Sequence, residues 1–395
     1  MFQRLKNIYH KFVAFLANLF FLFPGRKLVV VGVTGTDGKT TTVSLIYHIL
    51  KSAEKKVSML SSISAYIGDK EYETGFHVTT PSPFALQKFL KKAVDQGSEY
   101  FVLEVTSHAL DQHRIWGIPF KIGVLTNVTN EHLDYHKTYE NYVKTKEKLL
   151  RVAKIAVVSK DDGSYKLLGE ARKTKKDENW ITFGLSKNAD LNPANFPFES
   201  KVLLGDFNKL NALSAAACCR VLGLSDKSIK DAIKTFKMPT GRFDFVYRKD
   251  FSVVIDFAHT PNAFEQILSS LRPEVLGRII HVFGSAGERD RLKRPVMGEI
   301  SAKFADVLVL TAEDPRSEDP DKIIDEVASG IKKKDVEVLK ITDREKAIKA
   351  ALEMVRAGDL VLITGKAHEK SMTFGKEDHP WDEYKTVEEA LDERA

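Results

Sequence analysis

The sequence predicts an α/β protein made of two domains, each built around a mostly parallel sheet. Apolar, β-branched runs of strand length alternate along most of the chain with segments of helical periodicity. The length of 395 residues exceeds the size at which one hydrophobic core keeps growing. A turn-rich stretch at residues 238–242 separates two alternating series. We therefore expect an apolar segment at residues 1–27, a central domain at 28–240 and a C-terminal Rossmann-like α/β domain at 241–395.

The elements of the two series follow from their patterns. In the first series, strands are expected at residues 29–33, 57–60, 100–105, 122–126 and 155–158, and helices at 41–51, 84–94 and 139–151. In the second series, strands are expected at residues 253–256, 278–283, 307–311, 336–341 and 360–364. Strands joined by helices run parallel, so their carboxyl ends meet at one edge of each sheet. Functional loops are expected at that edge.

The composition is typical of a soluble protein of the cytoplasm. Hydrophobic residues make up 43% of the chain and charged residues 29%. The net charge is +6, and lysine and arginine are scattered among acids. This pattern predicts no nucleic-acid partner but favours anionic small-molecule substrates. The two cysteines, Cys218 and Cys219, are adjacent and cannot staple a fold, and so low a count suits a reducing compartment.

The first 27 residues contain an uncharged apolar run at residues 12–23. Basic residues flank it on both sides: Arg4, Lys6 and Lys11 before it, Arg26 and Lys27 after it. The run is shorter than the about 20 apolar residues that span a bilayer, and no small-residue cleavage site of a signal peptide follows it. Two interpretations stay open: a helix packed on the protein or on a partner, and a peripheral contact with a membrane.

The stretch VVVGVTGTDGKTTT, at residues 29–42, predicts a phosphate-binding loop, which makes the central domain a P-loop domain. Its glycines let several backbone N–H groups converge, and the helix that follows directs its N-terminus at the bound anion. In this arrangement Lys39 contacts the terminal phosphates of a nucleotide, and the Thr40 hydroxyl binds Mg²⁺.

Polar residues follow two other strands of the central domain. Glu104 closes the strand at residues 100–105, where its carboxylate suits Mg²⁺. The next strand is followed by TNVTNEHLDYH, which offers Glu131, His132, Asp134 and His136. Their common position at strand ends favours a site over isolated surface residues.

These motifs resemble those of the Mur ligases, the ATP-dependent amide-forming family of peptidoglycan precursor synthesis, and most closely the branch that adds the third residue of the stem peptide. Matching blocks run in family order over residues 28 to 375: GVTGTDGKTTT, TTP, EVTSHALDQHR, TNVTNEHLDYH, YVKTKEKLL, FNKLNALSAAA, GRFD, DFAHTP, GSAGERDRLKRP, EDPR and GKAHE.

The resemblance implies that the γ-phosphoryl group of ATP is transferred to a carboxylate and that an amine attacks the resulting acyl phosphate. It implies a catalytic set of Lys39, Glu104, His132 and Lys146, and metal ligation by Thr40, Glu104, His132 and Lys146. Lys146 would be carbamylated, which turns a repelled ammonium into a carboxylate-like ligand. A solvated helix face is the alternative interpretation, because Lys144, Lys146 and Lys148 alternate.

The same resemblance assigns the nucleotide contacts. The phosphate loop contributes Gly35, Thr36, Asp37, Gly38, Lys39, Thr40 and Thr41. Asn208 and Asn211 would hold the purine, although helix capping is common for asparagine. Arg242 would reach the phosphates, and Asp256 with His259 the ribose. Phe257 replaces the usual tyrosine of the family.

Two residue sets are implied for the other substrates. The muramoyl dipeptide would contact Thr79, Thr80, Thr106, Gln112 and Arg114, and the incoming amino acid would contact Arg289, Glu313, Asp314, Pro315, Arg316, Gly365 and Glu369. Arg316 suits the distal carboxylate of meso-diaminopimelate. Asp314 stands where the family has asparagine and adds negative charge. Diaminopimelate is therefore expected first, with lysine and other diamino acids as alternatives.

Family members begin with a separate domain that binds the uridine nucleotide, whereas here only residues 1–27 precede the first strand. We expect that domain to be absent, so that the two remaining domains hold the acceptor or the acceptor is lipid-linked. Ligases acting on folate, poly-glutamate or cyanophycin-like acceptors are an alternative. A non-catalytic partner of a true ligase is another, which the intact Lys39, Thr40, Glu104, His132 and Lys146 argue against. The oligomeric state stays open.

Overall fold

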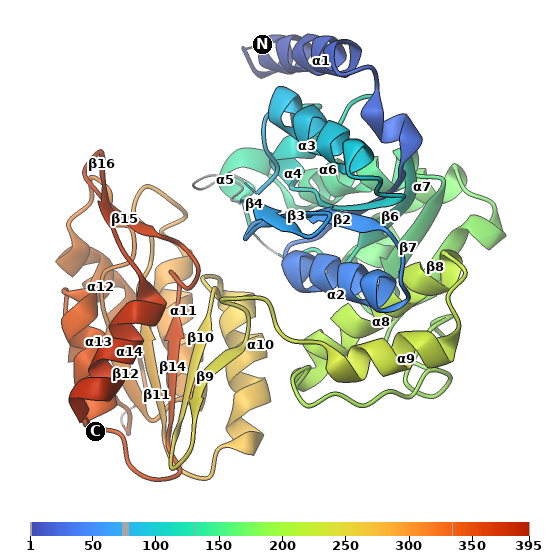
Figure 1. The fold of residues 1–395 in the computed structure, drawn as a ribbon. Helices are drawn as coiled ribbons and strands as arrows, with labels where there is room; N and C mark the ends of the chain where they lie inside the picture. The colour runs from blue at the N-terminus through green and yellow to red at the C-terminus, as the bar shows by residue number, and fades with distance from the viewer. Residues whose placement is uncertain (1, 73–78, 130, 334, 395) are drawn as a thin grey trace. The chain divides into compact units, whose positions relative to one another are not determined.

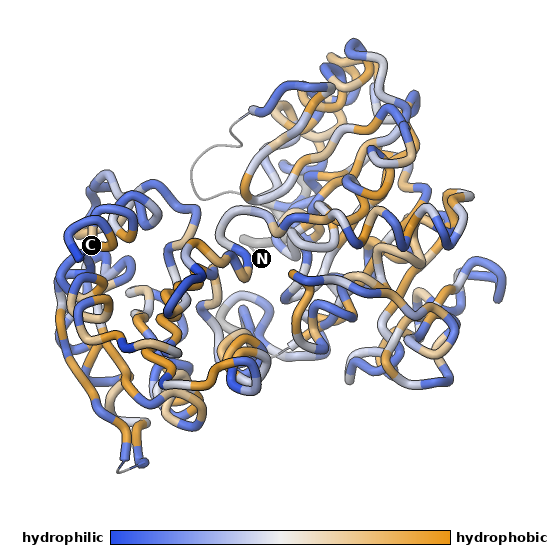
Figure 2. Tube along the Cα trace, turned by 60° about the horizontal axis from the view of Figure 1, so that its bottom comes forward, coloured by the Kyte–Doolittle hydropathy of each residue, from blue (hydrophilic) through white to orange (hydrophobic). Residues whose placement is uncertain are grey.

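A computed structural model describes residues 2–72, 79–129, 131–333 and 335–394, and the chain divides into two compact units, Met1–Lys237 and Met238–Ala395 (Figure 1). Both units are α/β, as the sequence predicts. Blue hydrophilic and orange hydrophobic stretches alternate along the chain in Figure 2, as amphipathic elements require.

The first unit is built on a sheet of strand order β4-β3-β2-β5-β1-β6-β7-β8. Its strands are β1 Val29–Thr34, β2 Val57–Leu60, β3 Ala65–Ile67, β4 Lys70–Tyr72, β5 Tyr100–Glu104, β6 Phe120–Leu125, β7 Ile155–Ser159 and β8 Trp180–Phe183. Strands β2, β5, β1, β6, β7 and β8 run parallel to one another, and β3 and β4 add an antiparallel edge. The predicted strands are confirmed to within about two residues, whereas β3, β4 and β8 were not expected.

Helices cover both faces of this sheet, with α3, α4 and α6 on one face and α2, α8 and α9 on the other (Figure 1). Their bounds are α1 Phe2–Phe20, α2 Lys39–Ser52, α3 Pro83–Asp95, α4 Ser107–Asp111, α5 Leu133–His136, α6 Tyr139–Val152, α7 Gly169–Lys173, α8 Gly205–Val221 and α9 Asp226–Thr235, with short 3₁₀ turns at Pro24–Lys27, Gly163–Leu167 and Asp177–Asn179. None of the helices in the described parts of the chain is long and apolar enough to cross a membrane.

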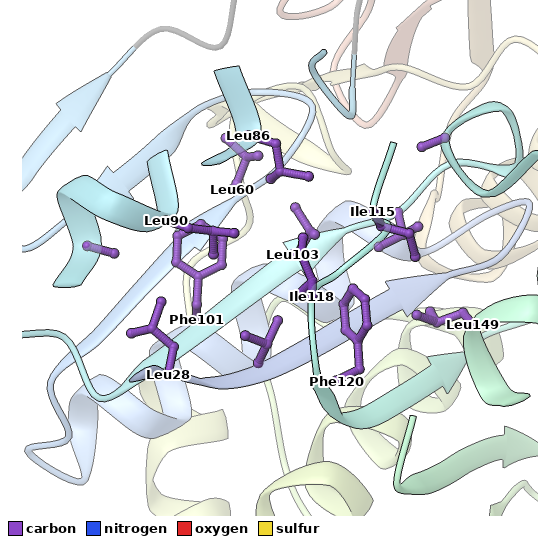
Figure 3. Packing of buried hydrophobic residues seen from close by; sticks show 14 of the residues in the cluster. Leu28, Leu60, Leu86, Leu90, Phe101, Leu103, Ile115, Ile118, Phe120 and Leu149 are labelled. Atoms are coloured by element: carbon purple, nitrogen blue, oxygen red, sulfur yellow. The ribbon is translucent and has the colours of Figure 1, made fainter. Parts of the chain in front are cut away.

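The core of the first unit lies where central strands meet α3 and α6. Leu90, Phe101 and Phe120 are among its buried side chains (Figure 3). Strand β1 is almost wholly buried, as a parallel strand covered on both faces should be. A Cβ at Gly32 would lie 2.7 Å from the Phe120 ring and 2.9 Å from Leu149. Gly32 therefore lets the core pack closely against β1.

The second unit has the strand order β13-β12-β11-β14-β10-β9. Its strands are β9 Asp244–Arg248, β10 Ser252–Asp256, β11 Ile279–Phe283, β12 Val307–Leu310, β13 Glu337–Lys340 and β14 Leu360–Thr364. All pairs are parallel except β9 with β10. The helices are α10 Pro261–Leu271, α11 Lys293–Phe304, α12 Pro320–Ala328, α13 Arg344–Glu353 and α14 Glu383–Arg394, a 3₁₀ turn covers Arg272–Glu274, and a hairpin pairs β15 Ser371–Phe374 with β16 Glu377–Pro380.

Candidate functional site

The predicted phosphate loop lies between β1 and α2, with α2 beginning at Lys39. Gly38 adopts φ 79°, and a Cβ there would lie 2.1 Å from the Asn211 Oδ1 atom, so glycine is required on both counts. The partial positive charge at the N-terminus of this 14-residue helix therefore lies at the loop. Such a terminus is suited to a phosphate.

Residues after β6 hold the loop in shape. The Thr126 hydroxyl donates to the Asp37 carbonyl at 2.7 Å. The Asn127 side chain accepts from the Asp37 N–H at 2.9 Å and donates to its carbonyl at 3.2 Å. Lys39 folds back so that its Nζ atom donates to the Thr36 carbonyl at 2.7 Å. Hydrogen bonds within the protein therefore hold the loop in one conformation, and such preorganisation favours tight anion binding.

Glu104 and Thr40, the predicted first metal ligands, lie together at the ends of β5 and the loop. The Thr40 hydroxyl donates to Glu104 Oε2 at 3.0 Å. Ser62 donates to both carboxylate oxygens, from its N–H and from its hydroxyl, at 2.9 Å each. Glu104 is only 1% exposed, and these donors from Thr40 and Ser62 are neutral.

This oxygen donor set fits Mg²⁺, a hard cation. No group of three or more histidine, cysteine or carboxylate side chains in the described parts of the chain could hold a metal alone. A cation here would therefore complete its shell with phosphate oxygens and water, as Mg²⁺ commonly does.

Lys146 lies on α6 with its side chain 1% exposed, so it does not belong to a solvated face. Its Nζ atom donates to the Gly35 carbonyl at 2.6 Å and lies 4.4 Å from the centre of the Tyr142 ring. Burial, reinforced by the nearby charge of Lys39, lowers the pKa of Lys146 well below its usual value. The amine therefore reaches its neutral, nucleophilic form more readily than an exposed lysine.

His132 lies in a group of rings beside Lys146. Its ring centroid is 5.4 Å from that of His108 and 6.0 Å from that of Tyr142. His136 contacts the Ser107 hydroxyl at 3.0 Å, and burial, followed by the charge of His108, lowers the pKa of His136 to about 4. Of the other residues in this block, Glu131 is half-buried, and the side chain of Asp134 lies outside the described residues.

The predicted acceptor residues join the Glu104 network through hydrogen bonds. The Thr80 hydroxyl donates to the Glu104 carbonyl at 3.0 Å and accepts from the Thr106 N–H at 3.0 Å. Arg114 donates to the Thr80 carbonyl at 2.7 Å and to Gln112 at 2.7 and 2.9 Å.

Ser62 was missed in the sequence. It binds Glu104 and also donates to the Thr79 hydroxyl at 3.2 Å. Its place just after a predicted strand was the available signal.

Asn208 and Asn211 lie on α8, both buried. Asn208 donates back to the Leu204 carbonyl at 3.0 Å, and Asn211 donates to the Asn208 oxygen at 3.3 Å. Neither residue is the N-cap, because Leu204 has that position. Asn211 instead packs against Gly38, which links α8 to the phosphate loop.

In the second unit, the predicted nucleotide residues lie around the first two strands: Arg242 just before β9, Asp256 at the end of β10 and His259 after it. The Asp256 carboxylate accepts from the Phe243 and Ala258 N–H groups at 2.6 Å each. The Arg242 guanidinium lies 4.8 Å from the centre of the Phe257 ring. Phenylalanine therefore keeps the stacking surface that a tyrosine would offer here. The His259 ring contacts the Phe257 carbonyl through Nδ1 at 2.7 Å.

The predicted amino-acid residues of the second unit follow β11, β12 and β14. Lys366 is fully buried, and its Nζ atom lies 2.8 Å from Asp314 Oδ1 and 2.5 Å from Glu369 Oε2. Burial alone would lower the pKa of Lys366, but the two carboxylates raise it. The charge that Asp314 adds is thus neutralised within the protein, and Lys366 is a residue that sequence reasoning left without a role.

The other residues of this set are placed differently. Arg316 is half-buried and donates to the Gly287 carbonyl at 2.7 Å. Arg289 is exposed, whereas Pro315 is buried. Gly365 has φ 108°, and a Cβ there would lie 2.7 Å from Glu313 Oε2. Burial raises the pKa of Glu313 against the opposing charges of nearby lysines and Arg344.

Comparison with known proteins gives consistent matches to one family. The Mur ligase middle domain matches residues 33–219, and the Mur ligase glutamate ligase domain matches residues 241–367. The chain is 36% identical over 403 residues to the UDP-N-acetylmuramoyl-L-alanyl-D-glutamate--2,6-diaminopimelate ligase 1 of Clostridium acetobutylicum, covering 97% of this chain and 82% of that protein. The corresponding ligase of Aquifex aeolicus is 38% identical over 394 residues, covering 95% and 80%.

Solved structures agree. A UDP-N-acetylmuramoyl-L-alanyl-D-glutamate--2,6-diaminopimelate ligase matches with a TM-score of 0.64 and 30% identity, covering 93% of this chain and 79% of that one. The MurF ligase of Thermotoga maritima in complex with ADP matches with a TM-score of 0.72 and 21% identity, covering 97% and 85%, and shares the fold.

Proposed function

Because the chain belongs to the Mur ligase family, we propose that it is an ATP-dependent ligase that adds a diamino acid, meso-diaminopimelate, to a muramoyl dipeptide in peptidoglycan synthesis. The observation that carries this proposal is the similarity, over 95–97% of the chain, to ligases named for that reaction. The acceptor would be UDP-N-acetylmuramoyl-L-alanyl-D-glutamate, and the reaction would take place in the cytoplasm.

The proposed chemistry needs no side-chain nucleophile. An oxygen of the glutamate side-chain carboxylate forms a bond to the γ-phosphorus of ATP as the bond to ADP breaks, giving an acyl phosphate. The amine of diaminopimelate then bonds to the acyl carbon, inorganic phosphate leaves, and the amine proton passes to solvent. Catalysis of such a reaction rests on positioning and charge stabilisation.

Residues of the first unit would supply that stabilisation. The loop N–H groups and Lys39 would hold the phosphates. Mg²⁺, when bound, would neutralise phosphate charge, and Thr40 with Glu104 would hold it. Thr80, Thr106 and Arg114 would orient the acceptor from the same network.

Carbamylation of Lys146 is part of this proposal. The neutral amine adds to CO₂ and loses a proton, which leaves a carbamate with one negative charge. The burial of Lys146 and its lowered pKa both favour the reactive neutral form. With His132, the carbamate would hold a second Mg²⁺.

The preference for diaminopimelate over lysine rests on Arg316. Lys366 already neutralises Asp314, so Asp314 need not repel a carboxylate of the substrate. The half-buried Arg316 guanidinium then suits the distal carboxylate that diaminopimelate has and lysine lacks.

The test is phosphate release from ATP with UDP-N-acetylmuramoyl-L-alanyl-D-glutamate as acceptor. Diaminopimelate, lysine and ornithine are added separately, with product mass as the readout and Lys39→Ala as the inactive control. Turnover with diaminopimelate alone supports the proposal. Turnover with lysine alone would overturn the assigned amino acid. No turnover with any amine, while ATP still binds, would favour another acceptor, including a lipid-linked one.

A further inference from the structure

Helix α1 is attached to the first unit through one narrow face. Ala14 and Ala17 are fully buried there, and α1 packs along α3 (Figure 1). Asn18, 1% exposed, donates to the Trp116 carbonyl at 2.7 Å. Gly117 has φ 85°, and a Cβ there would lie 2.7 Å from the Asn18 oxygen. Small residues and one buried amide thus fix which side of α1 faces outward.

The opposite face of α1 is apolar and exposed. This face, called the α1 apolar face below, comprises Tyr9, Phe12, Phe15, Leu16, Leu19 and Phe20, which are 38–72% exposed. It continues beyond the helix onto Leu22, which is 76% exposed, and onto Phe84 of α3, whose ring centroid is 6.1 Å from that of Phe20. A surface helix ordinarily turns polar residues outward, and a contiguous aromatic patch of this kind marks an interaction site.

The charged residues of the N-terminal segment that carries this face all have one sign. Residues 1–36 contain no aspartate or glutamate, but they contain Arg4, Lys6, Lys11, Arg26 and Lys27. Among the described side chains, Lys11, Arg26 and Lys27 are exposed, and Lys88 is exposed one turn after Phe84 on α3. An apolar face with a basic border is complementary to a surface that is apolar inside and negatively charged outside.

We propose that the α1 apolar face docks this protein peripherally on an anionic lipid bilayer, with α1 lying in the plane of the interface. Aromatic rings are well suited to the boundary between headgroups and acyl chains. A second copy of the chain fits less well, because a two-fold contact through this face would bring two basic borders together. The inference is independent of the proposed reaction, since α1 contributes no residue to that site.

The test is co-sedimentation of the full chain with vesicles of phosphatidylcholine alone or of phosphatidylcholine mixed with phosphatidylglycerol. We expect binding to the anionic vesicles and a marked loss in about 0.5 M salt, where charge is screened. The double variant Phe12→Glu, Leu19→Glu should bind at least about tenfold more weakly than the parent, because it places two charges in the apolar layer. Lys11→Glu with Lys27→Glu should weaken binding to anionic vesicles only.

The matched control is Leu276→Glu with Val152→Glu, which changes exposed apolar residues that are 99% and 60% exposed but lie outside the α1 apolar face. It should bind vesicles like the parent. Retained phosphate release in the double variant, or an unchanged circular dichroism spectrum if the parent releases none, shows that the variant is folded. Binding equal for the parent and the double variant would overturn the proposal. A parent chain that does not bind vesicles would also overturn it. If light scattering then showed a dimer of the parent that the double variant abolishes, the face would instead be a contact between two copies.

Discussion

Buried carboxylates in the two units are treated in opposite ways. In the first unit, Glu104 accepts hydrogen bonds from hydroxyl and backbone groups, which are neutral, and no charged side chain of the described residues pairs with it. In the second unit, Asp314 and Glu369 share the buried ammonium of Lys366. A buried charge without a counterion is costly. The first arrangement therefore suits a cation, as the proposed function requires, whereas in the second the ammonium of Lys366 already balances the carboxylates.

Removing the negative charge of Glu104 should produce the largest change. Glu104→Gln keeps the shape of the side chain but loses the charge that would hold Mg²⁺. We expect phosphate release to fall by about 10²–10³-fold, with a higher Mg²⁺ concentration needed for half-maximal rate. Thermal unfolding without Mg²⁺ should not occur at a lower temperature, because the variant buries no unpaired charge.

The matched control is Glu99→Gln, since Glu99 is an exposed glutamate just before β5. It should leave both the rate and the Mg²⁺ requirement unchanged. If Glu104→Gln kept the Mg²⁺ dependence of the parent, the Glu104 carboxylate would not be a Mg²⁺ ligand, and a metal would not explain the contrast between the two units.

Lys146 sharpens the contrast, because it is a buried lysine beside the proposed metal site. Lys146→Met should lower turnover by about 10²-fold or more, as for loss of a charged group that stabilises the transition state. Lys144→Met, an exposed lysine on the same helix, is the control. Bicarbonate should stimulate CO₂-depleted parent enzyme but not Lys146→Met. Equal rates with and without bicarbonate would argue against the carbamate.

The pH dependence of stability gives a second readout for Lys146. Burial depresses its folded-state pKa below the unfolded value of about 10.4, so the unfolded chain binds this proton more tightly. The resulting penalty is therefore greatest at low pH and vanishes as the pH rises above the unfolded pKa. In CO₂-free buffer, urea unfolding of Lys146→Met should show a shallower rise in stability with pH than the parent.

The Lys366 cluster tests the other half of the comparison. Lys366→Met leaves the buried Asp314 and the half-buried Glu369 without their shared ammonium, and we expect about 3–5 kcal/mol lower stability of the second unit. Asp314→Asn removes only one charge and should cost less. Lys370→Met, which breaks an exposed pair with Asp382, should change stability by at most about 1 kcal/mol. A small effect of Lys366→Met in urea unfolding would contradict a complete ion cluster.

Arg316 should affect specificity more than stability. Arg316→Ala should raise the KM for diaminopimelate by about tenfold or more, since a charge-assisted hydrogen bond pair is lost. The low activity expected with lysine should stay unchanged, because lysine has no distal carboxylate. If product formation fell equally with diaminopimelate and with lysine, Arg316 would not select between the two amines.

The central strands of both sheets could be predicted from the sequence, because parallel strands that are buried on both faces consist of continuous apolar runs. Short edge elements such as β3, β4 and β9, and the hairpin β15–β16, lack that signal, since they are partly exposed and pair antiparallel. The family membership expected from the ordered motifs is confirmed.

Side-chain pairing was harder to predict than the strands. The alternation of Lys144, Lys146 and Lys148 suggested one solvated face, but helical geometry puts residues 144 and 148 together and residue 146 on the opposite, buried side. The contacts of Ser62 with Glu104 and of Lys366 with Asp314 join segments that are 42 and 52 residues apart. Such pairs depend on how strand ends meet in the folded sheet, which the sequence pattern does not show. The roles of the individual site residues stay predictions.

The smallest effect is expected at Phe257, where the chain departs from the tyrosine usual in the family. Arg242 stacks on the Phe257 ring, and that contact depends on the aromatic face rather than on a hydroxyl. Phe257→Tyr should therefore change the KM for ATP by less than about threefold, whereas Phe257→Leu should raise it by about fivefold through loss of the stacking, which is worth roughly 1 kcal/mol. If Phe257→Tyr alone strongly improved ATP use, a missing hydrogen bond would outweigh the stacking, and the second unit would be less complete than its ion cluster indicates.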